Sequence, residues 1–218
     1  MSRYEFLIFD FGGTIADSES VILDTMRQAF EVAGIPAAPD EIVRARIGLD
    51  LHEMVAGLLE PEGALERVDE VAGLYRDRWL AGAHEQITLF DGIVDILEAC
   101  LSRGQELCIA TGKSRVGLER SLVAHDLERF FTAWATPDQV ERGKPHPDMV
   151  ELLLSTRPYE RSQVLMIGDS TLDLDMGHAA GVATCAVAWG THDEASLRSR
   201  EPAHFTSNLA ELSALLSA

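Results

Sequence analysis

Short apolar runs that recur along the chain, several of them ending at a polar residue, constrain the fold of this sequence more than any other feature. Each run is rich in branched and aromatic side chains and has the length of a strand buried on both faces. The runs cover residues 4–9, 106–111, 131–136, 164–169 and 182–188. Helical patterns separate them at residues 92–103, 114–127 and 147–155. This alternation predicts a doubly wound, Rossmann-like α/β core with a parallel sheet.

Residues Glu19 to about Glu85 interrupt the alternation, because they contain helical patterns and no strand-like run. Apolar residues such as Val21, Met26 and Phe30 follow helical spacing there. We therefore predict an α-helical cap of residues 18–85, inserted into a core of residues 1–17 and 86–218. Hinges are expected near residues 17–18 and 88–89. Because ligands of open parallel sheets bind outside the carboxyl ends of the strands, the site is expected beneath this cap.

Composition and charge exclude several classes of protein. The chain has 218 residues, of which 46% are hydrophobic, so a folded globular protein is expected. Against 36 acidic residues stand only 18 lysines and arginines, and the formal net charge of −18 produces a field that repels nucleic acid. The same field disfavours a small phosphorylated ligand, unless a metal ion or a well-placed lysine supplies positive charge locally.

No signal peptide or membrane span is expected. The first residues lack an apolar run, and the weakly apolar stretch of residues 179–189 is too short to cross a bilayer. The three cysteines, Cys100, Cys108 and Cys185, are odd in number and show no C-x-x-C spacing. Neither a zinc site nor a full disulfide framework is indicated, and the reducing cytoplasm is the predicted location.

Polar residues end three of the predicted strands. Asp10 ends the first and is followed by two glycines within three residues, which allow an anion to approach the backbone closely. Thr111-Gly112-Lys113 ends the second with a hydroxyl, a backbone amide and an ammonium group, a set that suits phosphate oxygens. Both motifs have an ordinary alternative, since Asp10 could cap a turn and Thr111 or Ser114 could be a helix N-cap.

The lysines and a pair of aspartates complete the candidate site. Only two lysines occur in the chain, Lys113 and Lys144, and both fall in candidate loops. Prolines on either side of His146 restrain the backbone beside Lys144. Asp169 and Asp173 follow the fourth run four residues apart, so one helical turn brings both toward a hard cation. The other nearby acids, Asp17 and Asp175, are expected to be surface or hinge residues.

Asp10, Thr111, Lys144 and Asp169 with Asp173 together resemble the four successive motifs of the haloacid-dehalogenase-like superfamily, in the same order. The helical insertion between the first and second motifs is similar to the α-helical cap of that superfamily. The nearest branch is that of the phosphoglycolate-phosphatase-like and β-phosphoglucomutase-like phosphatases. The resemblance covers roughly residues 4–210.

This resemblance implies a Mg²⁺-dependent phosphomonoester hydrolase that acts on a small phosphorylated metabolite through an aspartyl phosphate on Asp10. It implies that the catalytic residues are Asp10, Thr111 and Lys144. The implied metal-binding residues are Asp10, Gly12 through its carbonyl, Asp169 and, through water or a neighbouring ligand, Asp173. The implied phosphate-binding residues are Phe11, Gly12, Thr111, Gly112 and Lys144.

Gly12 departs from the phosphatase pattern, which has a second aspartate two residues after the nucleophile. That aspartate protonates the leaving alkoxide, and such general acids contribute about 10²–10⁴-fold to the rate. We therefore expect weak activity on alkyl phosphates, unless water, the substrate, His52 or Asp17 supplies the proton.

Gly12 also keeps other functions open. A module that binds Mg²⁺ and phosphate without turnover is one alternative. Phosphonate hydrolysis is another, although the cap has no lysine to form the Schiff base it requires. Carbon–halogen cleavage would need no general acid, but the retained Asp169 argues for the metal-dependent branch.

Substrate selection is expected to lie in the cap, where Arg44, Arg46 and the loop of residues 48–49 are candidates. Residues of these types on helices more often face solvent. Both a monomer and a homodimer are compatible with the sequence.

Overall fold

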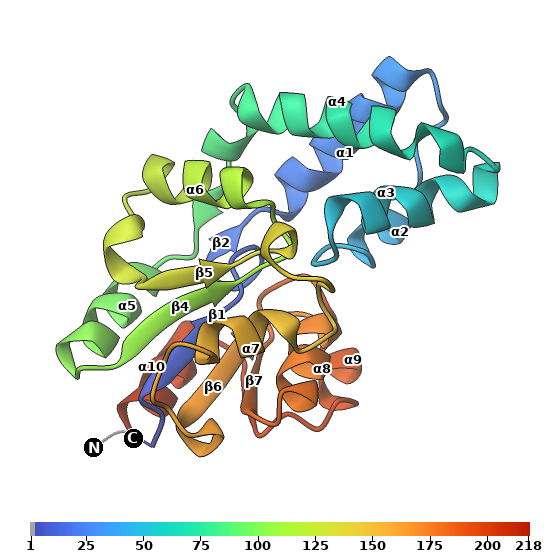
Figure 1. Ribbon diagram of the computed structural model, residues 1–218. Coiled ribbons are helices and arrows are strands. Elements are labelled where there is room, and N and C mark those ends of the chain that lie inside the picture. The colour runs from blue at the N-terminus through green and yellow to red at the C-terminus, as the bar shows by residue number, and fades with distance from the viewer. Residues whose placement is uncertain (1–2) are drawn as a thin grey trace.

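The computed structural model describes residues 3–218 and contains one six-stranded parallel sheet (Figure 1). The strand order is β5-β4-β1-β6-β7-β8, with β1 paired to β4 on one side and to β6 on the other. The strands are β1 (Phe6–Phe9), β4 (Glu106–Ala110), β5 (Ala133–Ala135), β6 (Val164–Gly168), β7 (Ala183–Val187) and β8 (His204–Thr206). The predicted α/β class is therefore confirmed.

Helices cover both faces of the sheet. Successive side chains of a strand point to opposite faces, so β1 contributes side chains to the apolar cluster on each face. Leu7 and Phe9 of β1 belong to the apolar cluster that includes α5, α6 and α10, whereas Phe6 and Ile8 pack with α7 and α8. All four side chains are completely buried, which explains the unbroken apolar run. The helices of the core are α5 (Ile93–Ser102), α6 (Arg115–Ala124), α7 (Asp148–Leu154), α8 (Thr171–Ala179), α9 (Glu194–Arg198) and α10 (Leu209–Ser217).

Four further helices form a layer of their own beyond the carboxyl ends of the strands (Figure 1). In this helical layer α4 packs against both α1 and α3. Its members are α1 (Glu19–Ala33), α2 (Asp40–Arg44), α3 (Leu51–Leu59) and α4 (Val68–Leu80). Short 3₁₀ turns lie at Glu60–Glu62, Leu65–Arg67, Ala83–Glu85, Glu128–Phe130, Pro137–Gln139 and Arg161–Gln163. The division into a core and a cap at residues 18 and 85 stays a prediction.

A two-stranded antiparallel sheet joins the helical layer to the core. β2 (Ala16–Asp17) pairs with β3 (Thr88–Leu89), with Ala16 opposite Leu89. The two chain crossings between the layer and the core therefore lie side by side. They coincide with the positions at which hinges are expected, and movement about them stays a prediction.

Several elements were not predicted from the sequence, and β8 and α4 are two of them. β8 has only three residues and pairs with β7 alone at the edge of the sheet, so it leaves no long apolar run. α4 carries many charged residues, and its buried face consists of Val71, Ala72, Tyr75 and Trp79.

The cysteines agree with the expected absence of a disulfide framework. All three are buried and free, and burial raises the pKa of Cys100 to about 11 and that of Cys185 to about 12. Among residues 3–218, no helix combines the length and the apolar character that crossing a bilayer requires.

Candidate active site

Site residues predicted from distant parts of the sequence meet at one edge of the sheet. Asp10 follows β1, Thr111 follows β4 and Asp169 follows β6, while Lys144 lies in the loop between β5 and α7. The four residues are only 2–4% exposed. Parallel strands bring their carboxyl ends together, so this convergence follows from the topology.

Lys144 forms two ion pairs inside the protein. Its Nζ lies 2.6 Å from Oδ1 of Asp10 and 2.5 Å from Oδ1 of Asp173. Burial raises the pKa of Asp10 above its usual value, although the ammonium of Lys144 opposes that shift. Burial alone would lower the pKa of Lys144, but the two carboxylates raise it above its usual range. Lys144 is therefore a fixed positive charge beside Asp10.

Asp169 is held by two hydrogen-bond donors. The hydroxyl of Thr14 donates to Oδ1 at 2.9 Å, and the backbone N–H of Thr191 donates to Oδ2 at 2.8 Å. Burial, together with the charges of Asp10 and Asp173, raises the pKa of Asp169 to about 7. Neither Thr14 nor Thr191 was identified from the sequence, because nothing in local spacing links them to Asp169.

Two glycines allow the backbone to lie against Asp169. Gly13 has a φ of +88°, and a Cβ atom at this residue would lie 2.1 Å from Oδ2 of Asp169. A Cβ atom at Gly190 would lie 2.2 Å from the Cβ of Asp169. A side chain at either position would displace the carboxylate.

The first turn of α8 fixes Asp173. Ser170 is the N-cap of this helix, and its backbone N–H and its hydroxyl donate to Oδ2 of Asp173 at 3.0 and 2.6 Å. This reciprocal capping box leaves Oδ1 of Asp173 facing Lys144.

Thr111 and Gly112 form the turn that follows β4. The N–H of Thr111 donates to the carbonyl oxygen of Ala135 at 3.2 Å, which ties the turn to β5. Ser114 is the N-cap of α6, because its hydroxyl accepts a hydrogen bond from the N–H of Gly117. Of the two N-cap alternatives, Ser114 therefore has that role, and Thr111 is left at the strand end.

The loop of residues 48–49 in the helical layer contacts this turn. A Cβ atom at Gly112 would lie 2.3 Å from the carbonyl oxygen of Gly48 and 2.7 Å from that of Leu49. Gly112 therefore admits the loop, and the loop lies beside the site as predicted.

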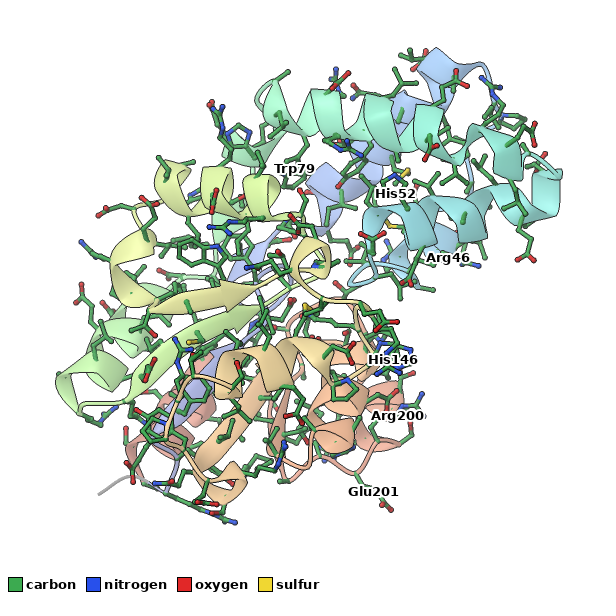
Figure 2. All side chains as sticks on the ribbon, viewed as in Figure 1. Arg46, His52, Trp79, His146, Arg200 and Glu201 are labelled. Atoms are coloured by element: carbon green, nitrogen blue, oxygen red, sulfur yellow. The ribbon has the colours of Figure 1, made fainter. Side chains whose placement is uncertain are left out.

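Lys113 connects the core with the helical layer. Its Nζ lies 3.9 Å from the ring centroid of Trp79, at the end of α4 that is next to α6 (Figure 2), and 5.8 Å from that of Phe11. Burial lowers the pKa of Lys113 to about 8, while the charge of Asp10 opposes the shift. Lys113 was identified from the sequence, but its partner Trp79 was not.

A cavity of about 630 Å³ lies between the helical layer and the strand ends. Its lining includes Asp10, Gly12, Thr111 and Gly112 from the core. The facing wall is largely apolar and is lined by Ile22, Leu49, Met54, Tyr75, Trp79 and Val116. A substrate in this cavity would reach the carboxylate of Asp10.

The space beside Gly12 is taken by Ser18. A Cβ atom at Gly12 would lie 2.7 Å from Oγ of Ser18 and 4.0 Å from Cε of Lys113. Ser18 is 1% exposed and is the residue that precedes α1. A serine hydroxyl is a poor acid, so Ser18 does not replace the aspartate that is missing at position 12.

Neither predicted proton donor, His52 or Asp17, is among the neighbours of Gly12. His52 lines the cavity, but its half-exposed side chain lies 3.8 Å from Asp50 and 3.6 Å from Asp69, at the surface of the helical layer (Figure 2). Asp17 is exposed and lies in β2. The structure thus gives no support to proton donation by either residue.

The remaining candidates lie away from the site. Arg44 donates to Glu19 at 2.8 Å, and Arg46 donates to the carbonyl oxygen of Ile42, so both arginines are engaged within the helical layer. Asp175 forms a surface ion pair with Arg200 at 3.2 Å, as expected for a surface residue. His146 is exposed at the outer surface of the core (Figure 2).

The carboxylates of the site form a donor set that suits a hard divalent cation. One oxygen atom from each of Asp10, Asp169 and Asp173 lies within 4.8 Å of the other two. Carboxylate oxygens are the ligands that Mg²⁺ prefers. Three clustered carboxylates exceed the single charge of Lys144, so the residues present fit a divalent cation.

A parallel sheet with a buried cluster of carboxylates and an ammonium group at its strand ends, covered by a helical layer, defines an α/β enzyme that acts on an anionic group. The chain belongs to the haloacid dehalogenase-like hydrolase family, because the profile of that family matches residues 7–187. The family that the sequence motifs resemble is thereby confirmed, and the protein is a hydrolase.

Curated proteins and solved structures agree with this assignment. The chain is 31% identical over 200 residues to the probable phosphatase IndB of Dickeya dadantii, covering 90% of this chain and 86% of that protein. It is 28% identical over 218 residues to the pyrophosphatase PpaX of Bacillus pumilus, covering 97% and 96%. A predicted phosphoglycolate phosphatase from Haemophilus somnus superposes with a TM-score of 0.87 at 19% identity, covering 97% of each chain, which shows the shared fold.

Proposed function

We propose that this protein is a Mg²⁺-dependent phosphatase that hydrolyses a small phosphorylated metabolite with Asp10 as the nucleophile. The observation that carries the proposal is the buried Asp10–Lys144–Asp173 ion-pair chain, in which Asp10 lines a cavity large enough for such a metabolite. The phosphatase names of the two curated relatives support the same reaction class.

Asp10 attacks phosphorus in the first step. A bond forms between a carboxylate oxygen and phosphorus, and the ester bond breaks with its electron pair on the leaving oxygen. Lys144 holds Asp10 in place and offsets negative charge on the phosphoryl group. The hydroxyl of Thr111 and the N–H of Gly112, at the same strand end, would bind phosphoryl oxygens. The backbone N–H of Phe11 donates a hydrogen bond to the Asp10 carboxylate. The turn of Phe11 and Gly12 would complete the phosphate-binding site.

Water completes the reaction in the second step. Its oxygen forms a bond to phosphorus, the bond from phosphorus to Asp10 breaks with its electron pair on the carboxylate, and phosphate leaves with the proton that the attacking water gives up. Asp10, Asp169 and the carbonyl oxygen of Gly12 would hold the cation, with Asp173 supporting it from its place beside Lys144. When bound, Mg²⁺ supplies positive charge that neutralises phosphoryl oxygens. Such local charge is what an anionic substrate needs in a protein of net charge −18.

The first experiment is phosphate release from p-nitrophenyl phosphate with Mg²⁺ and with EDTA. We expect the native protein to release phosphate with Mg²⁺ but not with EDTA. Asp10→Asn, which keeps the size of the side chain but removes the nucleophile, should release none. Asp17→Asn, an exposed carboxylate seven residues away, is the matched control and should retain activity. Release by Asp10→Asn would refute the nucleophile assignment.

A second experiment separates turnover from binding. After acid quench with ³²P-labelled substrate, the native protein should carry an acyl phosphate that hydroxylamine removes, and Asp10→Asn should carry none. If no ester releases phosphate while phosphate analogues still raise the melting temperature with Mg²⁺, the protein is a binding module and the phosphatase proposal fails.

A further inference from the structure

The cavity wall opposite Asp10 has the chemistry of a binding site for an uncharged, flat group. Tyr75 and Trp79 are stacked, with ring centroids 6.0 Å apart and planes 10° from parallel, and both line the cavity. Beyond Asp10, the acidic lining residues Asp50, Glu53, Asp138 and Glu141 outnumber the basic residues Lys113 and Arg76. A second phosphate or a polyanion would therefore meet repulsion, whereas an aromatic body would contact aromatic and aliphatic side chains.

The position of Gly12 restricts the leaving group. Neither Ser18, which fills the space beside Gly12, nor the exposed Asp17 and His52 is placed to give a proton to the leaving oxygen. The leaving group must then depart as an anion. The pKa of a phenol is near 10, roughly five to six units below the pKa of water. Aliphatic alcohols have pKa values close to that of water. Phenolate is therefore a far better leaving group at this site than an alkoxide.

Lys113 supplies the positive charge that a departing phenolate requires. Its side chain passes 4.0 Å from the position that a Cβ atom of residue 12 would take, and its ammonium group is held over Trp79. Burial lowers the pKa of Lys113, whereas the charge of Asp10 acts to raise it. Within residues 3–218, Lys113 forms no ion pair with a carboxylate. Because no carboxylate is paired with it, this charge can act on a substrate that is bound beside Asp10.

We propose that the substrate is an aryl phosphate, whose ring lies in the cavity beside Tyr75 and Trp79 and whose ester oxygen faces Lys113, the ammonium of which covers the Trp79 ring. This inference rests on the proposed phosphatase function. Asp10 forms its bond to phosphorus, the bond from phosphorus to the aryl oxygen breaks, and the electron pair stays on the phenolate. The ammonium of Lys113 stabilises this anion by its charge, and the phenolate takes a proton from water after it leaves the cavity.

The test compares four substrates with the Mg²⁺-loaded full chain: p-nitrophenyl phosphate, phenyl phosphate, glycerol phosphate and pyrophosphate. We expect kcat/KM for phenyl phosphate to exceed that for glycerol phosphate by about 100-fold or more, the range that a missing general acid predicts. Comparable values for the two esters, or a higher value for pyrophosphate, would overturn the inference and leave the phosphatase proposal intact. Failure to hydrolyse all four substrates would instead remove the phosphatase proposal.

Two variants test the assigned roles. Lys113→Met should lower kcat for phenyl phosphate more than for p-nitrophenyl phosphate, because p-nitrophenolate needs less stabilisation. Arg120→Met, an exposed cation on α6, is the control and should change neither value. An equal loss of kcat on both esters would contradict the role of Lys113 at the leaving oxygen. Trp79→Leu should raise KM for both aryl esters, and an unchanged KM would argue against ring binding at this wall.

Restoring the general acid provides the complementary test. Gly12→Asp should be combined with Ser18→Ala, because the new Cβ atom would otherwise lie 2.7 Å from the serine hydroxyl. Relative to Ser18→Ala, the double variant should raise the ratio of kcat/KM for glycerol phosphate to kcat/KM for p-nitrophenyl phosphate by about 10²-fold. Ser18→Ala alone is the control. A double variant that retains p-nitrophenyl phosphatase activity without a gain on glycerol phosphate would overturn the argument from Gly12.

Discussion

Asp169→Asn should make the metal-free protein more stable, and increasingly so as the pH rises. Asp169 has a pKa of about 7 in the folded protein and 3.8 in the unfolded chain, a difference of about 3 pKa units. Because the folded state binds this proton more tightly, stability falls as the pH rises from about 4 to 7. At 1.36 kcal/mol per unit, the raised pKa of Asp169 lowers the stability of the folded protein by about 4 kcal/mol at pH 8 and by about 2 kcal/mol at pH 5.

Urea unfolding in EDTA at pH 5 and pH 8 measures this cost. The free energy of unfolding of Asp169→Asn minus that of the native protein should increase by about 2–3 kcal/mol between the two pH values. Hydrogen bonds from Thr14 and Thr191 change equally at both pH values, so they cancel in this comparison. A difference that stays constant with pH would show that Asp169 does not carry a raised pKa, and the electrostatic account of the site would be wrong.

Three further outcomes are expected. Lys144→Met should lower the free energy of unfolding, measured in urea, by about 3–5 kcal/mol, because it leaves two buried carboxylates unpaired. Adding Asp10→Asn should restore part of this loss. A variant without any loss would contradict the ion-pair geometry. Gly13→Ala should destabilise the protein more than Gly63→Ala. Both glycines have a positive φ, so each alanine costs about 1–2 kcal/mol of unfolding free energy, but only at Gly13 would the new Cβ atom also collide with Asp169. Ellman's reagent at pH 8 should modify none of the three buried cysteines of the native protein and all three in guanidinium, and rapid modification of the native protein would refute their burial.

The parts of the fold that could be predicted are those with a local signature. A strand buried on both faces requires a continuous apolar run, so β1, β4 and β6 are visible in the sequence, and the polar residue that ends each run marks the site. The pairing of β2 with β3 involves two residues on each strand, too few to leave a pattern. Likewise, Lys113 and Trp79 are 34 positions apart on different layers, and only the packing of α4 against α6 brings them together.

Under the proposed function, a bound cation would let this acidic protein bind an anion and would control both stability and activity. The carboxylates of Asp10, Asp169 and Asp173 are buried close together, and Lys144 compensates only part of their charge. Burial, together with repulsion from Asp10 and Asp173, raises the pKa of Asp169, and a bound divalent cation would offset both effects, so the same event should stabilise the fold and prepare the site for a phosphate dianion. Two Mg²⁺ concentrations should therefore match. One half-saturates the rise in melting temperature, after extrapolation to the assay temperature, and the other half-saturates phosphate release at low substrate concentration. A tenfold disagreement would mean that the stabilising cation binds elsewhere, and the assignment of the carboxylate cluster as the metal site would fall with it.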